Sequence, residues 1–118
     1  MVTRSIRART TALNDAQLAM LQAMLEEQRR FRIEQLAAAA DPDRPPPART
    51  EADLEVQETI LRGARLALTD VESALARISH GTYGRCAHCG TTLPLERLEV
   101  LPQAALCMPC QREADAVR

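Results

Sequence analysis

The residues of this chain that are best suited to chemistry are its four cysteines. They form two Cys-x-x-Cys pairs, Cys86 with Cys89 and Cys107 with Cys110. Two such pairs joined by a short segment are typical of a zinc site, because four thiolates complete the tetrahedral shell that zinc prefers. A shell of four protein ligands leaves no position for a catalytic water. The pattern therefore predicts one structural zinc ion bound by these four side chains.

Other interpretations of the cysteines fit less well. Disulfides require an oxidising compartment, which nothing in the sequence indicates. A thioredoxin-like redox motif uses one Cys-x-x-Cys at a strand-to-helix junction, not two in a turn-rich segment. Gly90 follows the second cysteine, where a zinc turn often needs positive φ, and so favours zinc. His88 lies between two cysteines and is the alternative ligand, whereas His80 is expected at a helix end.

The composition indicates one small helical domain. The chain has 118 residues, only 2% of them aromatic, and its apolar residues are mainly alanine and leucine. These residues favour helix-on-helix packing over a sheet. No apolar run is long enough to span a membrane, and reduced cysteines without an export signal predict a cytoplasmic protein. Since the sequence shows neither a nucleophile–base pair nor an open metal site, we do not expect an enzyme.

The first of two long helices is expected over about residues 14–40. Asn14 and Gln17 match a capping box, and neither glycine nor proline interrupts the segment. Its inward positions recur every three or four residues, first apolar and then polar. They are Leu18, Leu21, Leu25, Gln28, Arg32 and Gln35.

The second helix is expected over about residues 50–80, with Thr50 as its cap and Gly81 at its end. Its apolar residues are spaced in steps of three and four over more than three heptads, which predicts a coiled-coil seam. The seam positions are Leu54, Gln57, Leu61, Ala64, Leu68, Val71, Leu75 and Ile78.

The proline-rich, acidic segment 41–50 separates the two helices. Prolines prevent helix continuation there, so the helices should fold back as an antiparallel hairpin over residues 14–80 with 41–50 as its tip. We expect the leucines of the first helix to lie against the late seam of the second. The predicted partners are Leu18, Leu21 and Leu25 on one side, and Leu68, Val71 and Leu75 on the other.

The remaining segments flank this hairpin. Residues 1–13 are interpreted as a mobile basic arm, and residues 81–118 as a four-cysteine zinc finger. Pro94 and Pro102 favour a short hairpin or turns between the cysteine pairs. A short C-terminal helix from about Gln111 is expected to pack on the base of the hairpin.

The segment from Ile78 to Cys110 resembles the DksA/TraR family of four-cysteine zinc fingers. The matching residues are Gly81-Thr82-Tyr83-Gly84-Arg85-Cys86-x-x-Cys89-Gly90, Leu93-Pro94-x-x-Arg97-Leu98, Pro102 and Cys107-x-x-Cys110. The preceding hairpin agrees in length and placement, so the resemblance covers roughly residues 14–115. It implies a bacterial regulator that binds RNA polymerase, with its coiled coil in the secondary channel and acidic tip residues near the active centre. In some members the nucleotide ppGpp acts with the protein, although no sequence feature here supports a nucleotide site.

The expected tip departs from the family pattern. Family tips carry Asp-x-x-Asp-x-Ala, whereas this chain has Asp41-Pro42-Asp43-Arg44-Pro45. The resemblance assigns partner binding to Asp41 and Asp43, but one residue fewer lies between them and Pro45 replaces the alanine. A change of one residue re-aims a carboxylate, and the effect of a charge depends on its placement to within ångströms. The altered tip therefore favours an alternative function, a zinc-stabilised adaptor with a different partner.

A third interpretation, a DNA-binding finger, requires a basic face. The arginines of the finger are offset by nearby acids, so we expect no direct sequence-specific DNA binding. The residues concerned are Arg85, Arg97 and Arg112, with Glu96, Glu99 and Glu113.

Overall fold

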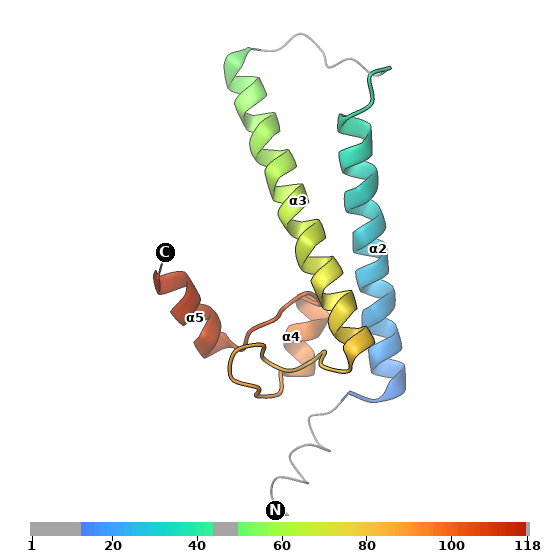
Figure 1. Cartoon of the computed structure of the whole chain (residues 1–118), viewed down its shortest axis with the longest axis vertical. Coiled ribbons are helices and arrows are strands. Elements are labelled where there is room, and N and C mark those ends of the chain that lie inside the picture. Colours follow the sequence, from blue (N-terminus) through green and yellow to red (C-terminus); the bar gives the residue numbers. More distant parts are fainter. Residues whose placement is uncertain (1–12, 44–49, 118) are drawn as a thin grey trace, which may run out of the picture.

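The computed structural model describes residues 13–43 and 50–117. In these ranges the chain forms α2 (Asp15–Ala39), α3 (Glu51–His80), α4 (Leu95–Val100) and α5 (Met108–Val117). The fold is mainly helical, as predicted: α2 and α3 form a long antiparallel hairpin, and a small four-cysteine module follows it (Figure 1). No helix in the described part of the chain is long and apolar enough to cross a membrane. All but Leu13 of the predicted N-terminal arm, and residues 44–49 of the predicted tip, lie outside the described residues.

Helix α2 begins at the predicted capping box. The Gln17 amide donates to Asn14 Oδ1 at 2.7 Å, and the Asn14 amide donates to Gln17 Oε1 at 3.0 Å. This reciprocal pair satisfies two N–H groups that a helix start otherwise leaves without partners.

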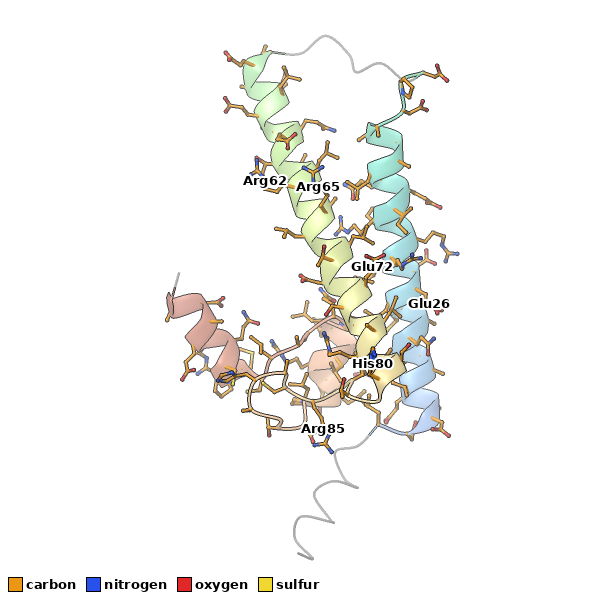
Figure 2. The ribbon with its side chains drawn as sticks, in the orientation of Figure 1. Glu26, Arg62, Arg65, Glu72, His80 and Arg85 are labelled. Carbon is orange, nitrogen blue, oxygen red and sulfur yellow. The ribbon has the colours of Figure 1, made fainter. Side chains whose placement is uncertain are left out.

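Helix α3 is capped at both ends. Thr50 and Asp53 form a second capping box, in which each backbone amide donates to the other side chain at 3.2 Å. Gly81 ends the helix with φ of 77°, a conformation that glycine adopts without steric cost. His80 is the last helical residue, as expected, and its Nδ1 lies 2.7 Å from the Ala76 carbonyl oxygen (Figure 2).

The predicted stripes of the two helices face each other. Every predicted inward residue of α2 is buried or half-buried. The same holds for α3 except at Leu54, which is 53% exposed. The long helices separate toward their 40–50 end in Figure 1, and Leu54 lies near that end of α3. The hairpin is therefore packed most tightly at the end that carries the finger.

The pairing of leucines differs in part from the prediction. Leu25 packs with Val71 and Ala74 of α3 in one buried cluster. Leu21 instead belongs to a second cluster with buried residues of the finger, Cys86, Leu93 and Leu98. Leu21 of the α2 stripe therefore packs against the finger, whereas helix spacing alone predicted that it packs against α3.

The segment between the cysteine pairs contains a short helix, where we predicted a hairpin or turns. Helix α4 lies between Pro94, which is its N-cap, and Pro102, which is buried. A proline before the first turn removes no helical hydrogen bond, so the two prolines bound this helix instead of preventing it. Leu98 is fully buried and anchors the helix to the core.

Helix α5 also departs from the prediction. It begins at Met108 instead of Gln111, and it extends away from the long helices (Figure 1). Its side chains from Arg112 to Ala116 are all exposed. The helix therefore does not pack on the hairpin base, because this polar stretch offers no apolar face that the base would bury.

We expect Leu25→Ala to lower the free energy of unfolding by about 2–5 kcal/mol, since it removes a buried side chain from the α2–α3 seam. Leu66→Ala is the matched control, because Leu66 is 62% exposed on α3 and should change stability by no more than about 0.5 kcal/mol. Denaturant unfolding of both variants at a fixed zinc concentration measures the difference. Equal effects would show that the seam does not lie where the structure places it.

Candidate metal centre

The four cysteine sulfurs converge at one point of the finger. Cys86 and Cys89 lie in the loop that follows α3, Cys107 precedes α5, and Cys110 lies in its first turn. All four Sγ atoms lie within 4.8 Å of one another, and those of Cys89 and Cys107 are 3.7 Å apart. Bonds of about 2.3 Å to a tetrahedral zinc ion would separate the sulfurs by about 3.8 Å. The cluster therefore has the size that one zinc ion requires.

The first cysteine pair sits in a tight turn. The Gly90 amide donates to the Cys86 carbonyl at 2.9 Å, and the Cys89 amide points to Cys86 Sγ at 3.5 Å. Gly90 has φ of 80°, which confirms the expected positive φ after the second cysteine. The Cys86 amide also donates to the Thr91 carbonyl at 2.7 Å, so the turn closes on the segment that leads to α4.

Backbone contacts join the two cysteine pairs. The Ala87 amide, inside the first pair, donates to the carbonyl of Ala105 at 2.7 Å, just before the second pair. The Gln111 amide donates to the Cys107 carbonyl at 2.8 Å and holds the second pair in a helical turn. The fold thus brings together two pairs that are separate in sequence.

The chemistry of the donors suits a cation. The amide of Cys89 lowers the pKa of the Cys86 thiol to about 5, while the neighbouring Cys107 side chain raises the pKa of Cys110. Four adjacent thiols cannot all ionise unless a positive charge lies among them, and a divalent ion supplies it. The sulfurs are free thiols, with no disulfide among the described cysteines.

Histidine 88, the alternative ligand, is exposed and does not belong to the cluster. Among the described residues, the four cysteines are the only group of three or more metal-binding side chains close enough to share an ion. All four predicted cysteines therefore meet, and the histidine between them does not.

Arg77 of α3 and Tyr83, which follows that helix, make polar contacts with the finger that the sequence analysis did not predict. Tyr83 donates its hydroxyl hydrogen to the Pro102 carbonyl at 2.7 Å. Arg77 of α3 points to the Gln103 and Ala104 carbonyls at 3.4 and 3.5 Å. Burial raises the pKa of Tyr83 to about 12, although the nearby Arg77 acts in the opposite direction. Tyr83 is the single tyrosine of the sequence and belongs to the motif that carries the family resemblance, but neither fact indicates its hydrogen-bond partner.

The fold and the site define a class of protein, a helical hairpin that carries a four-cysteine zinc finger. Residues 81–116 match the family model of the prokaryotic dksA/traR C4-type zinc finger. Over 112 residues, the chain is 28% identical to the RNA polymerase-binding transcription factor DksA of Escherichia coli (strain K12), which covers 87% of this chain and 74% of that protein. The solved structure of transcription factor DksA2 from Pseudomonas aeruginosa shares the fold, with a TM-score of 0.69 and 24% identity over 91% of this chain and 89% of that one.

Other relatives match mainly through shorter segments. General stress protein 16O of Bacillus subtilis (strain 168) is 33% identical over 63 residues, which are 53% of this chain and 39% of that protein. An uncharacterised protein of Aquifex aeolicus (strain VF5) is 38% identical over 48 residues, 41% of this chain and 33% of that protein. The chain thus spans little more than a third of the length of these curated relatives.

The finger of this protein, residues 81–116, therefore matches the DksA/TraR four-cysteine zinc-finger family, and the chain as a whole shares the fold of DksA2. Its four cysteines are positioned to bind one zinc ion. When bound, the ion supplies a structural cross-link between the loop after α3 and the start of α5.

We propose Cys86, Cys89, Cys107 and Cys110 as the individual ligands, and Cys89→Ser is expected to abolish the stoichiometric binding of zinc. His88→Ala is the matched control, since it changes the neighbouring residue and should leave one zinc per chain. Metal analysis after dialysis measures the zinc content. Retention of zinc by Cys89→Ser together with loss by His88→Ala would show that the histidine is the ligand.

Tyr83→Phe should lower the free energy of unfolding by about 1 kcal/mol at neutral pH, because it removes the hydrogen bond to Pro102. Folding raises the pKa of Tyr83 from its ordinary value of 10.0 to about 12, so the contribution of Tyr83 is complete below about pH 10 and is lost as the pH rises toward 12. The Phe variant should lack this part of the alkaline decline. Denaturant unfolding from neutral to alkaline pH measures it, and parallel curves for the two proteins would contradict the assignment.

Proposed function

We propose that this protein binds bacterial RNA polymerase and regulates transcription by protein–protein contact. The observation that carries the proposal is the shape of the chain: a long hairpin has the finger at one end and the acidic residues of its connection at the other (Figure 1). The Escherichia coli relative that bears the name RNA polymerase-binding transcription factor aligns with 87% of this chain. Such a partner also implies a cytoplasmic location.

In this proposal the hairpin enters the secondary channel of the polymerase with its 41–50 end first. Helix α3 has 30 residues, which corresponds to a length of about 45 Å. The two helices form a long projection from the finger, and they lie closest together near the finger and separate toward the far end (Figure 1). This shape suits insertion into a channel, with the finger remaining outside.

The proposed contacts of the tip are Asp41 and Asp43. Both side chains are exposed, and the Asp43 amide donates to Asp41 Oδ1 at 2.9 Å. One Asp41 oxygen therefore stabilises the turn that leads out of α2. Asp41 therefore both stabilises the turn and adds charge. Within the described residues, the Asp43 carboxylate makes no such hydrogen bond to the turn, so its proposed role is to contact the partner.

A photoreactive residue at position 43 of the zinc-loaded protein tests the proposal. We expect a cross-link to the catalytic subunit of purified core RNA polymerase, near its active centre and without DNA. The control carries the same probe at position 15, at the finger end of α2, and should not reach that region. If folded, zinc-loaded protein gives no cross-link from position 43, the secondary-channel proposal fails and the adaptor function takes its place.

Asp43→Asn should weaken the effect of the protein on transcription in vitro while leaving most of its affinity for the polymerase. An exposed charge contributes no more than about 1 kcal/mol, so the dissociation constant should change by less than about fivefold. Asp15→Asn removes an exposed carboxylate at the opposite end and is the matched control. If both variants regulate promoters as the wild type does, Asp43 is only a solubilising residue.

A further inference from the structure

The finger carries an open apolar groove between α4 and the start of α5. It has a volume of about 710 Å³, and its lining includes Pro94, Val100, Leu101 and Met108. Val100 is 77% exposed, and Leu101 and Met108 are 41% and 46% exposed. A contiguous exposed patch of this kind typically marks a contact surface, because leaving it in water is unfavourable.

The charged side chains around this groove indicate which kind of peptide segment could bind in it. Glu96 lines the groove and forms no ion pair within the described residues. Arg97 also lines it, but its Nε donates to the Leu106 carbonyl at 3.2 Å and its guanidinium contacts Met108 Sδ at 2.8 Å. With Arg97 held in this way, the groove offers apolar surface beside an acidic group, so it suits a segment with an aliphatic side chain next to a basic one.

The groove and the first described residue of the chain, Leu13, are linked through Thr92. Thr92 lines the groove and also a smaller cavity of about 120 Å³, which Leu13 lines as well. Leu13 packs against the core of the finger, and its Cδ1 lies 3.5 Å from where a Cβ on Gly84 would be. Residues 1–12 therefore join the described chain at a residue whose own cavity shares Thr92 with the groove.

These preceding residues have the chemistry that the groove selects. Residues 1–12 contain Ile6 with Arg4 and Arg7 close to it in sequence, and Arg9 follows. Leu13 lies seven positions after Ile6 (13 − 6 = 7), and an extended chain spanning seven positions reaches about 23 Å. We propose that the groove is a docking site for the chain's own residues 1–12, with Ile6 against Val100 and Met108 and with arginines facing Glu96. This docking does not depend on the polymerase.

The methyl resonances of the methionines test the proposal in the full zinc-loaded chain labelled with methyl-¹³C methionine. Ile6→Asp should shift the resonance of Met108, because it removes the aliphatic contact in the groove. Met20 is the internal control, since it is similarly exposed, at 41%, but lies on α2 and does not line the groove. An unmoved Met108 resonance in Ile6→Asp would overturn the proposal.

A reciprocal variant tests the same contact from the side of the groove. Val100→Asp changes a side chain that is 77% exposed, so the core remains intact. In the proposed state, trypsin should cleave after Arg4, Arg7 and Arg9 faster in Val100→Asp and in Ile6→Asp than in the wild type. Equal cleavage rates would count against docking. A Met108 resonance that moves on dilution of the wild type would mean that a second copy fills the groove, and would also overturn the proposal.

Discussion

The meeting of the two cysteine pairs is the constraint on which the rest of the structure depends. Four sulfurs within 4.8 Å of one another require the loop after α3 and the start of α5 to lie side by side. The finger has few buried side chains of its own, so a segment this small needs a further cross-link to hold one conformation. One zinc ion provides that cross-link, and its binding energy then contributes directly to folding.

The finger in turn defines the base of the hairpin. Leu21 of α2 packs with Cys86, Leu93 and Leu98, so the metal-binding loop and the long helix share one buried cluster. Tyr83 and Arg77 add polar contacts from the α3 side to the segment after α4. An exposed ion pair between Arg29 and Glu72 also bridges the long helices, but such pairs contribute little. The buried contacts between the described elements therefore become fewer from the finger toward the far ends of α2 and α3.

This gradient agrees with the proposed function. A rod that is anchored at one end and carries exposed carboxylates at the other can present charge far from its own core. The inward stripe of α2 becomes polar after Leu25, at Gln28, Arg32 and Gln35, so the outer half of the hairpin lacks a continuous apolar seam. The apolar groove of the finger lies at the opposite end from these carboxylates. Docking of the N-terminal residues there would leave the hairpin accessible to a partner.

Local patterns in the sequence determined much of this protein: the capping box at Asn14, the cap at Thr50, the ends of the long helices, the facing stripes, Gly90 and the four cysteines that meet. Most of these features depend on residues a few positions apart, where spacing and side-chain chemistry are sufficient. The four cysteines are different, because Cys89 and Cys107 are 18 positions apart, and it is the preference of zinc for four thiolates that predicts their meeting. Only the tertiary structure decided that Leu21 joins the finger, that α4 forms between two prolines and that α5 extends away. It also decided the bond between Tyr83 and Pro102, which are 19 residues apart. Such contacts depend on how packed elements meet in space, and no local period in the sequence records that.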